Sequence, residues 1–157
     1  MLCLRVLQTL GDTGLAPHRL ELEISESAMV GDIVSAKKAL AAFHDAGVRL
    51  ALDDFGTGNS SLNHLRECRF DRIKIDRSFV HSMVDSAEDA SFVRAIVGLS
   101  KALAIPVTAE GIESDRVIGP LIAEGCSEGQ GFNFAAAMPA AEALELSAEK
   151  SPLRSTG

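Results

Sequence analysis

Tryptophan and tyrosine are absent from the 157 residues, and phenylalanine occurs only seven times. Proteins that bind single-stranded nucleic acid commonly stack bases on aromatic side chains, so this composition disfavours that function. Cysteine is also scarce, because Cys3, Cys68 and Cys126 lie far apart and form no C-x-x-C pair. Such spacing suits neither a disulfide framework nor a zinc site, and it is typical of proteins in a reducing cytoplasm.

An excess of basic residues is missing as well. Lys and Arg number 15 against 22 Asp and Glu, which gives a formal net charge of −7. A protein that coats DNA or RNA needs a basic face, so we expect no nucleic-acid partner. No apolar run approaches the ~18 residues of a membrane span, and the N-terminus has no signal-peptide pattern. We therefore expect a cytoplasmic protein without a membrane segment.

Short strand-like apolar segments alternate with segments of helical period along the chain. This alternation is typical of parallel βαβ units and predicts an α/β fold. The expected strands are 20–25, 48–54, 72–76, 106–111 and a weaker one at 127–132. Helices are expected at 4–10 and at 140–148. A third expected helix has Asp32 as its N-terminal cap and an apolar face of Ala36, Ala39, Leu40 and Phe43. A fourth has an apolar face of Phe92, Ile96, Leu99 and Leu103. We expect one domain over residues 1–149 and a disordered tail over 150–157.

Four of the expected strands alternate apolar and polar side chains. In the first, Leu20, Leu22 and Ile24 share one face, and Glu21 and Glu23 share the other. A parallel sheet covered by helices on both faces has nearly continuous apolar strands, so the alternation argues against a doubly wound fold. A TIM-type (β/α) barrel fits better, because one strand face packs on helices and the other lines the interior. Since such barrels typically have ~250 residues, we predict an incomplete barrel with about five parallel strands and flanking helices.

Charged residues on the interior face of a barrel need partners, because an unpaired buried charge is costly. Glu21 and Arg49 lie deep in their strands, and we interpret them as an internal salt bridge. Other charged residues end their strands, at the rim where barrel enzymes carry their active sites. These are Glu23, Asp53, Lys74 and Glu110.

Three acidic positions thus converge on the rim together with Lys74: Glu23, Asp53 with its neighbour Asp54, and Glu110. Clustered carboxylates without His or Cys suit a hard divalent cation such as Mg²⁺ or Mn²⁺. Two such cations can hold an attacking water and stabilise an in-line displacement at phosphorus. A nearby lysine can orient that water or neutralise the developing charge.

Five motifs follow one another along the chain and cover nearly all of it. They are L-E-L-E-I-S-E-S (20–27), L-D-D-F-G-T-G-N-S-S-L (52–62), D-R-I-K-I-D-R-S-F-V (71–80), A-E-G-I-E-S (109–114) and E-G-C-S-E-G-Q-G-F (124–132). In this order and at this spacing, the chain resembles the EAL family of bacterial cyclic-di-GMP phosphodiesterases. Members of that family open one phosphodiester of cyclic-di-GMP to give linear pGpG.

The resemblance implies roles for eight side chains. The implied metal ligands are Glu23, Asp53, Asp54 and Glu110. The implied catalytic residues are Lys74, beside the nucleophilic water, with Asp53 and Glu110. The implied ligand-binding residues are Gln130 in the wall of the site, Glu26, which anchors a mobile loop, and Glu113 in the same acidic cluster. The implied cofactor is Mg²⁺ or Mn²⁺, and the implied partner is cyclic-di-GMP.

The chain departs from the family pattern in three ways. The strand with the Glu-Ala-Leu motif that names the family, and the next strand with an asparagine ligand, are expected upstream of Met1. We therefore expect a C-terminal portion of the domain that binds metal weakly and hydrolyses cyclic-di-GMP slowly or not at all. Asn59 replaces an aromatic residue, and residues 134–139 replace a stretch that usually carries an arginine able to contact an anionic ligand.

Three functions are open at this point. The chain is a phosphodiesterase, a catalytically inactive relic that binds cyclic-di-GMP or a protein, or an unrelated barrel enzyme with phosphate substrates. An incomplete barrel leaves strand edges unpaired, and such edges favour pairing with another chain. We therefore also expect a homodimer that covers the open edges by pairing or swapping strands.

Overall fold

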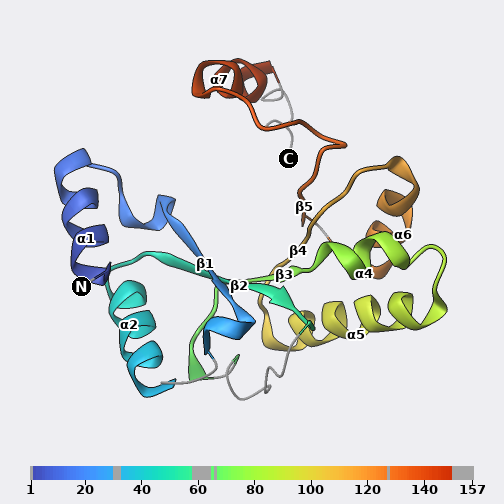
Figure 1. Ribbon diagram of the computed structural model, residues 1–157, viewed down its shortest axis with the longest axis horizontal. Coiled ribbons are helices and arrows are strands. Elements are labelled where there is room, and N and C mark those ends of the chain that lie inside the picture. The colour runs from blue at the N-terminus through green and yellow to red at the C-terminus, as the bar shows by residue number, and fades with distance from the viewer. Residues whose placement is uncertain (1, 30–32, 58–64, 66, 127, 150–157) are drawn as a thin grey trace, which may run out of the picture.

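The structure, a computed structural model, describes residues 2–29, 33–57, 65, 67–126 and 128–149. Its centre is a five-stranded parallel sheet in the order β1-β2-β3-β4-β5, with each strand beside the next one in sequence (Figure 1). The strands are β1 (Glu21–Ser25), β2 (Arg49–Phe55), β3 (Arg72–Ile75), β4 (Val107–Ala109) and β5 (Glu128–Gly129). Because β1 and β5 both lie at edges, the sheet is not closed. The prediction of an incomplete TIM-type barrel with five parallel strands is confirmed.

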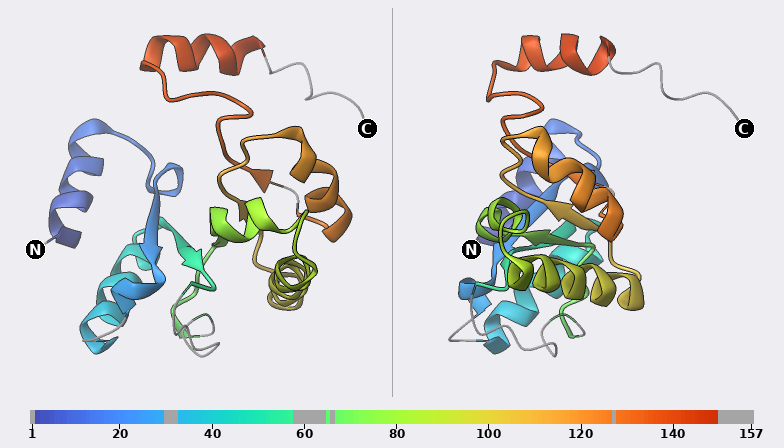
Figure 2. Two further views of the ribbon diagram at one scale, coloured as in Figure 1. Left: turned by 45° about the vertical axis from the view of Figure 1, so that its right-hand side comes forward. Right: turned by 90° about the vertical axis from the view of Figure 1, so that its right-hand side faces the viewer.

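Helices connect and flank the strands. They are α1 (Leu2–Thr13), α2 (Ile33–Asp45), α4 (Arg77–Ser82), α5 (Ala87–Leu103), α6 (Ile118–Glu124) and α7 (Ala140–Glu149), with 3-10 turns η1 (Pro17–Arg19), η2 (Glu26–Met29) and η3 (Asp115–Val117). Figure 2 shows α7 apart from the sheet and from the other helices. Among the described residues, no helix combines the length and apolar character that crossing a bilayer requires.

The core lies between one face of the sheet and the helices. Leu50 and Leu52 of β2 and Ile73 and Ile75 of β3 are fully buried on this face. Helix α5 contributes Val93, Ile96 and Val97, and α2 contributes Leu40 and Phe43. The alternation along the strands is therefore confirmed, because the other face of these strands carries Asp53, Arg72 and Lys74. The charged side chains of the sheet are left on the concave, open face.

The ends of the helices differ in part from the prediction. Helix α1 runs through Gly11 and ends at Thr13, where Gly14 adopts a positive φ of 69°. Ala39 of α2 is exposed, so it does not share the buried face of Leu40. Helix α5 ends before Pro106 as expected, with Ala104 in a left-handed conformation. Asp32, the predicted cap, and the predicted tail at 150–157 lie outside the described residues.

The tripeptide Glu142-Ala143-Leu144 matches the letters of the motif that names the EAL family. It lies in α7, a helix, and all three residues are exposed. The family motif is expected on a strand of the barrel. Residues 142–144 lie in a helix and therefore do not take the place of that motif.

Candidate functional site

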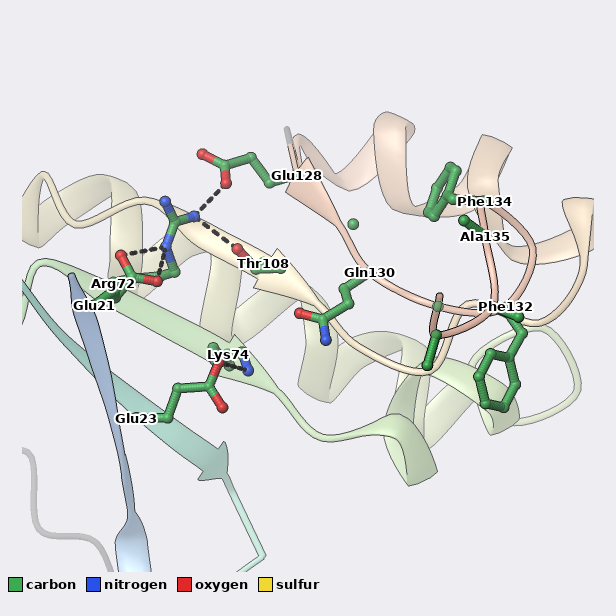
Figure 3. Close-up of a pocket in the computed structure, with 14 residues that line it drawn as sticks. Glu21, Glu23, Arg72, Lys74, Thr108, Glu128, Gln130, Phe132, Phe134 and Ala135 are labelled. Carbon is green, nitrogen blue, oxygen red and sulfur yellow. Dashed lines mark hydrogen bonds and ion pairs between the residues drawn. The ribbon is translucent and has the colours of Figure 1, made fainter. Parts of the chain in front are cut away.

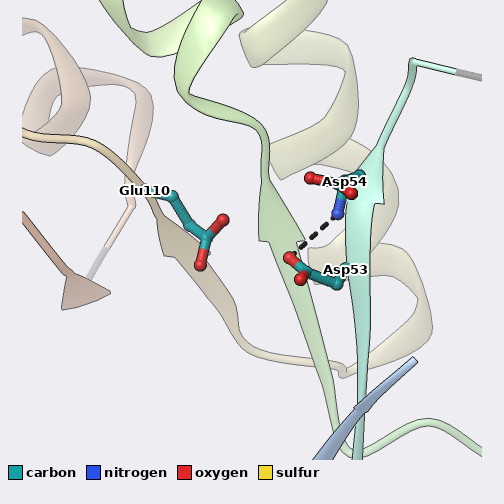
Figure 4. A group of neighbouring side chains, drawn as sticks. All are labelled: Asp53, Asp54 and Glu110. Carbon is teal, nitrogen blue, oxygen red and sulfur yellow. Dashed lines mark hydrogen bonds between the residues drawn. The ribbon is translucent and has the colours of Figure 1, made fainter. Parts of the chain in front are cut away.

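The end of β2 places two aspartates at the rim of the sheet. The register between β2 and β3 shifts between Leu52 and Phe55, and Asp54 within this irregularity has a φ of 54°. Aspartate tolerates this left-handed conformation better than most residues do. The backbone N–H of Asp54 donates a hydrogen bond of 2.9 Å to Oδ1 of Asp53 (Figure 4). The bulge therefore brings both carboxylates to one rim of the sheet.

Glu110 reaches the same place from the end of β4. Its backbone N–H donates to the carbonyl oxygen of Ile75 at 3.1 Å, which continues the pairing of β3 with β4. Asp53, Asp54 and Glu110 each offer a carboxylate oxygen, and these atoms lie within 4.8 Å of one another (Figure 4). A set made only of carboxylate oxygens fits a hard divalent cation. Three of the four predicted metal ligands are thus brought together.

Lys74 lies between these carboxylates. Its side chain is only 4% exposed, and its ammonium group makes ion pairs with Glu23 and Glu110. The same Nζ atom lies 3.9 Å from Oδ1 of Asp53. Burial lowers the pKa of Lys74, but the hydrogen bonds that its ammonium group donates to Glu110 and Glu23 outweigh burial and leave the pKa above its ordinary value. Lys74 is therefore a fixed positive charge beside the carboxylate cluster.

Two carboxylates of the cluster also have raised pKa values, which for an acid means that the charged form is disfavoured. Burial raises the pKa of Asp54, and the neighbouring carboxylates of Asp53 and Asp76 raise it further. Burial also raises the pKa of Glu110, although its contacts with Lys74 lower it in part. Both acids therefore hold their negative charge at a cost that a bound cation would relieve.

Glu23 and Glu26 lie outside the three-carboxylate cluster. Glu23, the fourth predicted ligand, is half exposed and reaches the cluster through its ion pair with Lys74 (Figure 3). Glu26 is buried, and its Oε2 accepts a hydrogen bond of 3.1 Å from the backbone N–H of Gly56. Glu26 therefore holds the backbone directly after β2, and its implied role in anchoring a mobile loop stays a prediction.

Gln130 and Glu113 line the space around the cluster. A cavity of about 500 Å³ is bordered by both residues together with Asp54 and Glu110. Gln130 also borders a cavity of about 650 Å³ on the concave face, which it shares with Lys74 (Figure 3). The position of both residues agrees with a ligand-binding role, and the role itself stays a prediction.

Sequence reasoning missed two residues of this site. Asp76 and Arg77 border the 500 Å³ cavity, and the carboxylate of Asp76 raises the pKa of Asp54. Asp76 also caps α4, because its Oδ1 accepts a hydrogen bond from the N–H of Ser78 at 2.9 Å. The signal was present, since Asp76 follows Arg72 and Lys74 at the period of a strand.

The predicted salt bridge between Glu21 and Arg49 is present, but Arg72 is the closer partner of Glu21. Glu21 accepts hydrogen bonds of 3.1 and 3.2 Å from Nε of Arg72, whereas Nε of Arg49 lies 3.9 Å away. Arg72 also donates to Thr108 at 2.7 Å and pairs with Glu128 (Figure 3). One guanidinium group therefore connects β1, β3, β4 and β5 across the concave face.

Comparison with known sequences gives one family. The sequence model of the EAL domain matches residues 2–137. The uncharacterized protein y4lL of Sinorhizobium fredii is 40% identical over 148 residues, which are 94% of this chain and 18% of that protein. An uncharacterized signaling protein of Caulobacter vibrioides is 48% identical over 127 residues, which are 81% of this chain and 16% of that protein. The chain thus spans less than a fifth of either relative.

Solved structures agree with the sequence comparison. The EAL domain of Mycobacterium smegmatis DcpA is 36% identical with a TM-score of 0.87, over 94% of this chain and 66% of that one. The PaMucR phosphodiesterase in complex with c-di-GMP is 36% identical with a TM-score of 0.83, over 88% and 56%. Klebsiella pneumoniae BlrP1 in a manganese and c-di-GMP complex is 32% identical with a TM-score of 0.77, over 82% and 33%. Five parallel strands, carboxylates gathered at their ends and these matches lead to one conclusion: the chain belongs to the EAL domain family.

Proposed function

We propose that this chain carries a cyclic-di-GMP phosphodiesterase site that opens one phosphodiester to give linear pGpG. The observation that supports this most is the group of Asp53, Asp54 and Glu110, whose oxygens lie within 4.8 Å of one another beside Lys74. Two structural relatives support the substrate class, because PaMucR and BlrP1 were solved with c-di-GMP.

The cofactor that we propose is Mn²⁺ or Mg²⁺, held by Asp53, Asp54 and Glu110. The donor set is all oxygen, and BlrP1 was solved with manganese. When bound, such a cation supplies Lewis-acid polarisation of a phosphodiester oxygen and a water of lowered pKa. Binding is weak, because the buried ammonium group of Lys74 already neutralises Glu110 and lies 3.9 Å from Asp53.

The side chains of the chain contribute position and charge. Lys74 is the group that orients the attacking water and offsets negative charge in the transition state. Its charge is secure, since the carboxylates of Glu110 and Glu23 hold its pKa above the ordinary value despite burial. Glu26 fixes the backbone of Gly56 and so the path of the chain directly after the two aspartates. Gln130 and Glu113 form part of the wall against which the substrate lies.

We further propose that the protein acts in the cytoplasm as a homodimer. Strand β1 lies at an edge of the sheet, and an edge strand offers unpaired backbone groups to another chain. A groove of about 960 Å³ runs along this edge between α1 and β1, and its apolar lining includes Leu10, Leu20 and Leu22. Sedimentation velocity tests the dimer: a concentration-dependent dimer supports it, and a folded monomer at all concentrations contradicts it.

Binding and turnover are measured separately to test the function. Calorimetry with c-di-GMP and Mn²⁺ reports ligand binding, and chromatography of the products reports pGpG. We expect binding with slow hydrolysis that stops when a chelator removes the cation. Binding without any hydrolysis favours instead the inactive relic that works as a binding module.

A further inference from the structure

The loop that carries Glu110 and Glu113 lies against one face of helix α4. Gly111 has a φ of 64°, and a Cβ atom built at this position would lie 2.4 Å from Cβ of Arg77. The backbone of the loop therefore packs directly on the first turn of the helix. His81 stands four residues after Arg77, so both side chains lie on the same face of α4.

His81 also contacts Gly111, through the carbonyl oxygen of the glycine. The carbonyl oxygen of Gly111 accepts a hydrogen bond of 2.9 Å from Nε2 of His81. The carboxylate of Glu113 lies 3.7 Å from the same nitrogen atom. Since a carbonyl oxygen only accepts, the contact requires a proton on Nε2.

The hydrogen bond falls at the centre of the backbone network that places Glu110. The N–H of Glu110 donates to Ile75 at 3.1 Å, and the N–H of Ile112 donates to Gln130 at 3.0 Å. These two bonds join the loop to β3 and to the end of β5, and the His81 bond lies between them. The His81 bond therefore connects α4, the helix directly after β3, with the loop that begins at Glu110. Glu110 in turn pairs with Lys74 of β3.

We propose that His81 is a positioning residue that holds Glu110 in the cation-binding cluster through the carbonyl oxygen of Gly111. The effect of His81 on metal binding rests on the proposed function, whereas its effect on the position of the loop rests on the backbone geometry alone. Groups that orient the ligands of a metal are worth about 10–100-fold in metal affinity when they are removed.

Two substitutions of His81 and one control separate this role from a general effect on folding. His81→Ala removes the donor, whereas His81→Gln keeps an N–H at a similar distance from the backbone. His44→Ala is the matched control, because His44 also lies in the last turn of a helix, α2, away from the cluster. Equal melting temperatures of the three variants show that each has kept its fold.

Hydrogen exchange of the metal-free chain gives the first result. We expect the amides of Glu110 and Ile112 to exchange about fivefold faster in His81→Ala, as for the loss of one hydrogen bond, and unchanged in the other two variants. We also expect the Mn²⁺ dissociation constant to rise about tenfold in His81→Ala only. Exchange in His81→Ala that equals the His44→Ala control overturns the inference, as does a His81→Gln variant impaired as much as His81→Ala. A wild-type chain that binds no Mn²⁺ contradicts the proposed function, and the exchange rates still decide the role of His81.

Discussion

Lys74 of β3 pairs with Glu110, the residue that follows β4, inside the cluster that is suited to a cation. The ammonium group therefore takes the place of part of the positive charge that a metal would bring. A metal that binds to Asp53 and Glu110 must do so against the repulsion of this buried lysine. The ion pair therefore stabilises the carboxylates in the absence of metal, and it lowers the affinity of the cluster for a cation.

Lys74→Met tests this competition. Loss of one positive charge at 3.9 Å from Asp53 strengthens the attraction for a second one, so we expect Mn²⁺ to bind at least about threefold more tightly. We expect hydrolysis to be lost at the same time, because nothing then orients the water. Lys37→Met, which removes an exposed lysine paired with Glu67, is the control and leaves the Mn²⁺ affinity unchanged. Weaker Mn²⁺ binding in Lys74→Met speaks against the competition.

Asp54→Asn is expected to stabilise the metal-free chain. Burial and the carboxylates of Asp53 and Asp76 raise the pKa of Asp54 in the folded state, so its ionised form costs stability at neutral pH. Asparagine removes the charge and tolerates the φ of 54° equally well. We expect a rise of roughly 1–3 °C in melting temperature at pH 7 in the presence of a chelator.

The pH dependence of that difference checks its cause. As the pH falls through the raised pKa, folded Asp54 takes up a proton and the cost disappears. The advantage of Asp54→Asn over wild type is then largest at neutral pH and shrinks on acidification. An advantage that stays constant with pH shows that charge is not the reason.

Arg72→Met removes the guanidinium group that joins four strands. The side chain of Arg72 is 15% exposed, and its loss removes the counter-charge of Glu128 and leaves Glu21 with only the more distant Arg49. We expect a loss of about 3 kcal/mol in the free energy of unfolding, as for other largely buried ion pairs that lose one partner. Arg49→Met is the control, because Arg49 is 49% exposed and lies as far as 3.9 Å from Glu21. We expect it to lower the free energy of unfolding by less than about 1 kcal/mol. Equal losses, measured by urea denaturation, contradict the assignment.

Gly56→Ala tests how closely the backbone directly after β2 packs against Phe92. A Cβ at Gly56 would lie 2.5 Å from the ring of Phe92, and the φ there is 100°. We expect a loss of about 2–4 kcal/mol, the sum of the left-handed backbone and the steric contact. Gly14→Ala shares a positive φ but meets nothing within 4 Å, so it is expected to cost about 1–2 kcal/mol. Equal costs at the two glycines show that Phe92 yields to the added methyl group.

The strands and the carboxylate cluster were accessible from sequence because they depend on local periodicity. Alternation of two residues places Lys74 on the face opposite Ile73 and Ile75, and parallel strands end at one rim. Asp53 and Glu110 therefore meet whatever the details of the loops. The two residues are far apart in sequence, and only the parallel order of the strands brings them together.

Contacts that depend on register and on loop packing were not accessible in this way. Glu21 is paired with Arg49 in the strand register, yet its carboxylate turns to Arg72, two strands away, whose guanidinium group also binds Thr108 and Glu128. The contact of His81 with Gly111 depends on how α4 lies on the next loop, and no period in the sequence reports this. The first helix was expected to end at residue 10, but α1 continues through Gly11, because a single glycine within a helix costs only about 1 kcal/mol.

The most direct test of the proposed function is the rate of pGpG formation from cyclic-di-GMP at saturating Mn²⁺, compared between wild type and Asp53→Asn. Asparagine keeps the shape of Asp53 and removes one of the three charged ligands of the cluster. We expect slow formation of pGpG by the wild type, which a chelator abolishes, and a rate at least about tenfold lower in Asp53→Asn. Formation of pGpG at equal rates in both proteins, or no pGpG from a folded wild-type chain with Mn²⁺ and cyclic-di-GMP bound, would contradict the account.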